Sequence, residues 1–177
     1  MPTPNLNPQF PNPYIADYHG QDVVAFEYLD PLILRREIDA VKMRGGADDA
    51  EYVVGAPYRV RYRLAGEAQS RTITVPKGML TDLSSVPRLL RGIVGQVGPH
   101  LEASIVHDFL YVAWQDTPGW TARSEDWDFA NKIMRAGMVE ATVDDIQIHL
   151  IYTAVDSFFG WSVYQDDDPP PRYVVVP

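Results

Sequence analysis

The sequence contains no cysteine, few basic residues and no long apolar run. Without cysteine, disulfide scaffolds and thiolate zinc sites are excluded. The chain carries 15 Lys and Arg against 24 Asp and Glu, a net charge of −9. Because broad phosphate binding needs a positive surface, we expect no nucleic-acid partner. Apolar runs stay well below the roughly 18 residues of a membrane-spanning helix, so we also expect no membrane span.

Proline, in contrast, is abundant, with 15 among 177 residues, and nine of these lie near the two ends. The nine are Pro2, Pro4, Pro8, Pro11, Pro13, Pro169, Pro170, Pro171 and Pro177. We therefore divide the chain into an extended arm (1–18), a single domain (19–162) and an acidic, proline-rich tail with a short terminal strand (163–177). Aromatic residues such as Tyr14 and Tyr18 can anchor the N-terminal arm. The two ends either dock onto neighbouring subunits, pack back onto their own domain or stay disordered.

Strand patterns precede helix patterns along the domain. Residues 58–64 alternate between apolar side chains and arginine, and residues 71–75 follow as the second strand of a hairpin. Helical segments are predicted over about 87–93, 98–114, 124–137 and 142–160, the last with a capping box formed by Thr142 and Asp145. The order indicates an α+β fold: N-terminal antiparallel strands, then three to four C-terminal helices, with extended arms at both ends.

The first candidate site is the segment from Thr81 to Pro87, which places one carboxylate and three hydroxyls between a strand and a helix. In one interpretation Ser84 or Ser85 caps the helix and Asp82 forms an Asx turn. In the other, Asp82 and Ser85 line a functional site at this junction.

The second candidate site is a stripe of polar side chains on the helix over 98–114. At about 100° per residue, Ser104, His107, Asp108 and Tyr111 share one face, and apolar side chains take the rest of the circumference. Such a helix is largely buried, so its polar groups need partners, and Asp82 could supply one. The stripe is either a structural hydrogen-bond network or an active site. We expect no cofactor and no metal, although His107 with carboxylates could form a mononuclear metal site.

Outside these segments, Asp128 and Lys132 have the i, i+4 spacing of an exposed ion pair on the next helix.

Both candidate segments together resemble the bacterial and phage family catalogued as domain of unknown function 1353. Its hallmark is Thr-Asp-x-x-Ser-x-Pro followed by a helix with His-Asp-x-x-Tyr. The matching residues are Thr81, Asp82, Ser85, Pro87, His107, Asp108 and Tyr111. Asp128 departs from the family's spacing by one residue. The resemblance implies no particular activity, but members are frequently encoded by tailed phages and prophages.

Two functions follow as hypotheses. The first is a virion-associated or assembly protein, a tail or neck module that is assembled in the host cytoplasm. It docks onto other phage structural proteins through its arms and is oligomeric or part of a larger assembly. The second is a small hydrolase, with peptidoglycan as the natural substrate. In it His107 acts as general base, oriented by Asp82 or Asp108, with Ser85 or water as nucleophile and Tyr111 in the same site. A third interpretation is an accessory protein that binds a host factor through its acidic surface.

Overall fold

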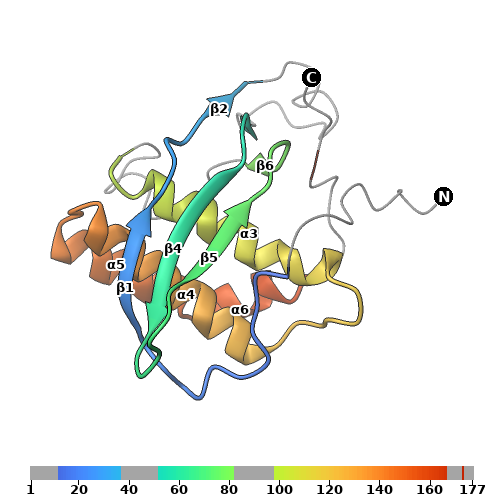
Figure 1. Ribbon diagram of the computed structural model, residues 1–177, viewed down its shortest axis with the longest axis vertical. Coiled ribbons are helices and arrows are strands. Elements are labelled where there is room, and N and C mark those ends of the chain that lie inside the picture. Colours follow the sequence, from blue (N-terminus) through green and yellow to red (C-terminus); the bar gives the residue numbers. More distant parts are fainter. Residues whose placement is uncertain (1–11, 37–51, 82–97, 167–172, 174–177) are drawn as a thin grey trace.

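The computed structural model describes residues 12–36, 52–81, 98–166 and 173. Within this part of the chain, six strands form two small sheets and are followed by four helices (Figure 1). The helices lie together against one face of the larger sheet. The predicted α+β layout, with antiparallel strands first and helices after them, is confirmed.

The larger sheet has the order β1–β4–β5, formed by β1 (Val23–Tyr28), β4 (Tyr58–Leu64) and β5 (Arg71–Val75). Both pairings are antiparallel, and β4 and β5 form the predicted hairpin. The alternation in β4 is also confirmed, because one face of the strand is buried and the other faces outward. The buried side chains are those of Tyr58, Val60, Tyr62 and Leu64.

The smaller sheet has the order β2–β3–β6, formed by β2 (Leu34–Arg35), β3 (Tyr52–Val54) and β6 (Leu80–Thr81). Its pairings are antiparallel. Tyr173 forms an antiparallel bridge with Met79, the residue before β6. Tyr173 of the C-terminal tail thus lies against its own domain.

The helices are α3 (Leu101–Asp116), α4 (Ser124–Glu140), α5 (Asp145–Val155) and α6 (Phe158–Tyr164). The main core lies between the larger sheet and the pair α3 and α4, and a second apolar cluster joins α3 and α4 to α5. That second cluster is built from Ala103, Met134, Met138, Val143, Ile148, Ile151 and Val155. None of the described helices combines the length and hydropathy needed to cross a membrane.

Two glycines that the sequence predicts as helix ends lie inside helices instead. A Cβ on Gly137 would lie 2.8 Å from the Tyr28 hydroxyl and 3.0 Å from the Ala103 side chain. Glycine here lets α4 approach β1 and α3 closely, and α4 continues to Glu140. A Cβ on Gly160 would lie 2.0 Å from a backbone carbonyl oxygen at the end of α5. This glycine therefore allows α6 to pack against the end of α5.

The prediction of one helix over 142–160 is wrong, because the segment contains two helices. Thr142 has a positive φ of 57°, so it ends the preceding turn and begins no helix. The side chain of Asp144, not the predicted box with Asp145, caps α5 by accepting two backbone N–H bonds. Ser157 caps α6, where its hydroxyl accepts the backbone N–H of Gly160. The predicted short helix over 87–93 lies outside the described residues.

The described part of the N-terminal arm packs back onto the domain. Tyr14 and Tyr18 are only 4% and 5% exposed and belong to the main core. The Tyr14 hydroxyl donates to the carbonyl of Leu110 and accepts the N–H of Trp114. Of the three alternatives for the arm, residues 12–18 adopt the one in which the arm packs back onto its own domain. The prediction for residues 1–11 lies outside the described residues.

Candidate functional site

The predicted polar stripe on α3 lies on one face of the helix and joins it to three other elements. His107 and Tyr111 both contact Asn131 of α4. Asp108 accepts a hydrogen bond of 2.7 Å from the hydroxyl of Thr81 at the end of β6. The structure thus brings His107, Asp108 and Tyr111 together with the first residue of the other family motif. Two further residues of the predicted site, Asp82 and Ser85, lie outside the described residues.

His107 has a defined tautomer. Its Nε2 lies 3.0 Å from Oδ1 of Asn131, an oxygen that also accepts the hydroxyl of Tyr111. The amide nitrogen of Asn131 faces the carbonyl of Val155 and the carboxylate of Asp156. Oδ1 is therefore the acceptor, so Nε2 carries the proton and Nδ1 keeps its lone pair. No described group forms a hydrogen bond with Nδ1.

The environment of His107 keeps the ring neutral. The side chain is 2% exposed. Burial lowers the pKa of His107 from its ordinary 6.5 to about 4, against a smaller opposing effect of the hydrogen bond to Asn131. A neutral imidazole with a free lone pair has the chemical form of a general base. In the described arrangement, however, the ring is closed off from bulk solvent.

Tyr111 links three helices. Its hydroxyl lies 3.1 Å from Oδ1 of Asn131 and accepts the indole N–H of Trp127 at 2.9 Å. A longer contact reaches the carbonyl of Val155 at the end of α5. Burial raises the pKa of Tyr111 well above its usual value, so the hydroxyl stays protonated and acts as a donor.

Asn131 is the central residue of this network, and sequence reasoning missed it. It is fully buried in the middle of α4. Asparagine has a low intrinsic preference for the interior of a helix. An asparagine among apolar neighbours was therefore the signal in the sequence that could have identified this residue. Its partners lie 20 or more residues away in sequence, so no local pattern names them.

A second buried network surrounds Asp126, which is also fully buried on α4. Its carboxylate accepts hydrogen bonds from the hydroxyl of Tyr18 at 2.8 Å and the indole of Trp120 at 2.7 Å, and a charge-assisted bond from Arg123 at 3.0 Å. Arg123 also donates to the carbonyl of Ile15 in the arm. Burial, together with the nearby carboxylate, raises the pKa of Tyr18 far above its usual value, so it remains a donor. This network holds residues 12–18 on the domain.

Two smaller expectations can be compared with the structure. Asp128 and Lys132 form the predicted i, i+4 ion pair, at 2.9 Å, with the side chain of Asp128 43% exposed and that of Lys132 18% exposed. In the part of the chain that the structure describes, no three His, Asp or Glu side chains are grouped to hold a metal ion.

Helix α6 presents an exposed apolar surface that the sequence analysis did not predict. Three of its seven side chains are large, apolar and exposed: Phe158 at 87%, Phe159 at 70% and Val163 at 51%. We call these three residues the α6 patch. The helix behind them is well fixed, because the indole of Trp114 donates to the carbonyl of Tyr164. Exposed apolar clusters of this kind mark interaction sites.

Comparison with known proteins identifies a family that the chain matches. Residues 58–155, more than half of the chain, match the model of a family described as "Protein of unknown function (DUF1353)". No curated protein and no solved structure matches the chain.

Proposed function

The chain belongs to the DUF1353 family, and we propose that it is a bacteriophage virion-associated or assembly protein that docks onto neighbouring subunits. The observation that carries this proposal is the α6 patch. The phage context comes from the resemblance described above, since members of this family are frequently encoded by tailed phages and prophages. Other structural proteins of the particle are the proposed partners, and the virion is the proposed location.

The α6 patch has the properties of a preformed docking surface. Burying an exposed Phe or Val side chain contributes about 1.5–3 kcal/mol, so Phe158, Phe159 and Val163 together offer a substantial driving force for association. The backbone of α6 is already held by its Ser157 cap and by the bond from Trp114 to Tyr164. Binding therefore costs little additional ordering of the helix.

The described part of the arm has a different role in this proposal. Tyr14 and Tyr18 are bound to their own domain, so residues 12–18 are not free to reach a neighbour. The proposal that residues 1–11 and 174–177 add contacts to other subunits remains a prediction. The main docking contact is assigned to the α6 patch.

The test is carried out on the phage or prophage-bearing strain that encodes the chain. We expect mass spectrometry to detect the protein in purified particles, or deletion of its gene to block particle formation. The double variant Phe158→Ser/Phe159→Ser should reproduce the deletion while the isolated protein stays folded. Ile33→Ser is the matched control, since Ile33 is an exposed apolar residue next to β2, a strand that lies away from α6 in Figure 1. Normal particles that lack the protein and form without its gene would refute the proposal.

A small hydrolase is the second candidate, and one specific observation favours it. Nδ1 of His107 has no hydrogen-bond partner among the described residues, while Asn131 fixes the proton on Nε2. This is the protonation state required of a general base, with Asp108 and Tyr111 on the same helix face. Asp82 and Ser85 complete the proposed site, and peptidoglycan is the proposed substrate.

The hydrolase proposal is tested by turbidity loss of purified peptidoglycan. His107→Gln should abolish the activity while the unfolding midpoint stays near that of the wild-type protein. His149→Gln is the matched control, because His149 is exposed on α5. Lack of any cleavage by the wild-type protein would exclude peptidoglycan hydrolysis, and equal loss of activity and stability in His107→Gln would assign the residue a structural role.

A further inference from the structure

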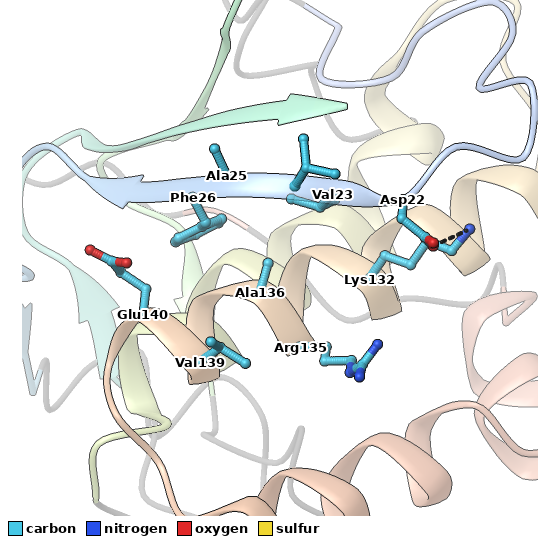
Figure 2. Close-up of a pocket in the computed structure, with 10 residues that line it drawn as sticks. Asp22, Val23, Ala25, Phe26, Lys132, Arg135, Ala136, Val139 and Glu140 are labelled. Atoms are coloured by element: carbon cyan, nitrogen blue, oxygen red, sulfur yellow. Dashed lines mark ion pairs between the residues drawn. The ribbon is translucent and has the colours of Figure 1, made fainter. Parts of the chain in front are cut away.

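A groove of about 610 Å³ runs between β1 and α4 (Figure 2). Its apolar lining comes from both elements: Val23, Val24, Ala25 and Phe26 of β1, and Ala136 and Val139 of α4. Val24 and Val139 are 51% and 59% exposed, so the groove offers apolar surface to a partner. It is separate from the α6 patch and shares no residue with it.

One wall of the groove is the edge of a sheet. Among the described residues, β1 pairs only with β4. The N–H of Leu29 donates to the carbonyl of Arg59 on β4. Since alternate residues of an antiparallel strand bond to the same neighbour, Phe26 and Tyr28 point their N–H and C=O groups away from β4. The edge therefore offers backbone donors and acceptors to another strand.

The two ends of the groove carry opposite charges. Arg135 and Glu140 are both exposed, and neither forms an ion pair with a described residue, although the guanidinium of Arg135 lies over the ring of Tyr152 on α5, 5.7 Å from its centroid. In Figure 2 they lie toward opposite ends of the groove. Lys132, next to Arg135, is already paired with Asp128 at 2.9 Å and with Asp22, which also lines this end of the groove, at 3.5 Å. Arg135 and Glu140 are therefore the charges available to a partner.

The strand and the helix run in the same direction. Lys132 near the middle of α4 lies 3.5 Å from Asp22 before β1, and farther along both elements the Tyr28 hydroxyl donates to the carbonyl of Gly137. The positive end of the groove thus lies near the start of β1, and the negative end lies near its end.

We propose that this groove binds a second copy of the chain, through antiparallel pairing of two β1 strands about a two-fold axis. The two-fold axis reverses one copy relative to the other. Arg135 of each copy then faces Glu140 of the second copy, and Ala136 faces Val139. The surface is self-complementary in both charge and shape, as an isologous interface requires.

The resulting dimer has one continuous six-stranded sheet, made from the two three-stranded sheets, and the two α4 helices lie side by side on one of its faces. The pairing removes the exposed edge of β1, which would otherwise be open to unspecific strand addition. It also buries the exposed faces of Val24 and Val139. This homodimer does not depend on the phage role proposed above.

Charge exchange in the purified full-length chain tests the dimer by sedimentation velocity. We expect the wild-type protein to be dimeric. Arg135→Glu and Glu140→Arg should each produce monomers. In either variant, positions 135 and 140 carry charges of the same sign, and these face each other twice across the two-fold axis. The double variant R135E/E140R should restore the dimer, and an equimolar mixture of the two single variants should form a heterodimer.

Glu125→Arg is the control, since Glu125 is exposed on the same helix outside the groove. Hydrogen exchange gives a second measurement: the amides of Phe26 and Tyr28 should be protected in the wild-type dimer and exchange faster in R135E. A wild-type monomer would overturn the proposal. A dimer that persists in R135E but dissociates in Phe158→Ser/Phe159→Ser would also overturn the proposal. That second result would still support docking through the α6 patch.

Discussion

Helix α4 carries two buried polar residues, Asp126 and Asn131, whose surroundings are organised differently. Asp126 is charged, and it accepts bonds from a phenol, an indole and a guanidinium. Asn131 is neutral, and it connects His107 and Tyr111 to the end of α5. The first network holds the N-terminal arm, whereas the second joins α3, the helix with the family's His-Asp-x-x-Tyr motif, to α4 and α5.

The buried acceptors of the two networks differ in how completely their hydrogen-bonding capacity is used. The carboxylate of Asp126 has donors on both oxygens, and Arg123 compensates its charge. In the other network, Nδ1 of His107 is buried without a hydrogen-bond partner among the described residues. An unpaired buried acceptor has a cost in stability, so the second network is the place to look for a role other than stability.

Removing the carboxylate of the first network should have the largest effect. Asp126→Ala leaves Arg123, Trp120 and Tyr18 without their shared acceptor, and we expect a loss of about 3–5 kcal/mol in the free energy of unfolding. Urea denaturation measures this loss. A change below about 1 kcal/mol would show that the network contributes little to holding the arm.

The second network should make stability depend on pH. The pKa of His107 is about 4 in the folded protein, and we take its ordinary 6.5 for the unfolded chain. Between these values the unfolded chain binds a proton that the folded one does not, so stability is full above pH 6.5 and falls by about 3 kcal/mol as the pH approaches 4. His100, also buried with a lowered pKa, acts in the same direction.

Denaturation curves recorded between about pH 7 and pH 4 measure this dependence. His107→Gln should flatten it, whereas exposed His149 serves as the control through His149→Gln. An unchanged slope in His107→Gln would mean that another group causes the dependence.

A single bond between the arm and the domain should have an intermediate effect. Tyr18→Phe removes the hydroxyl that donates to Asp126 and keeps the ring that stacks on Phe129. Because the acceptor is charged, we expect a loss of about 2 kcal/mol. Limited proteolysis should also cleave the variant faster near residues 12–18. If the arm is equally protected in the variant, the ring contacts alone hold it.

The smallest effect is expected at the partly exposed ion pair of the same helix. Asp128→Ala removes one of the two carboxylates near Lys132 and leaves Asp22, so the free energy of unfolding should change by no more than about 0.5 kcal/mol. Measured beside Asp126→Ala, it separates the effect of a buried carboxylate from that of an exposed one. Similar losses in both variants would contradict that distinction.

The features that sequence could predict are those with a local period. The alternation over residues 58–64 identifies the central strand, and the spacing of His107, Asp108 and Tyr111 places them on one helix face. The smaller sheet was not predicted, because strands of two or three residues are too short to show a period.

What sequence could not predict depends on contacts between distant segments. In the sequence Gly137 has the appearance of a helix end. In the structure it lies within α4, because Tyr28 and Ala103 pack too closely against it to leave room for a side chain. Asn131 becomes the centre of the site only when α3 lies beside α4. The exposure of Phe158 likewise follows from the break in the chain between α5 and α6. The sequence predicted one continuous helix here, and that prediction contains no such break.

The attachment of the arm has a consequence for the order of events during synthesis. Tyr18 bonds to a carboxylate 108 residues later in the chain, and Tyr14 bonds to a carbonyl 96 residues later. At about 5–20 residues per second, the ribosome needs on the order of 5–20 s to make those residues. Residues 12–18 thus leave the ribosome well before their partners do, and their two tyrosines remain open to chaperones until α3 and α4 have been made.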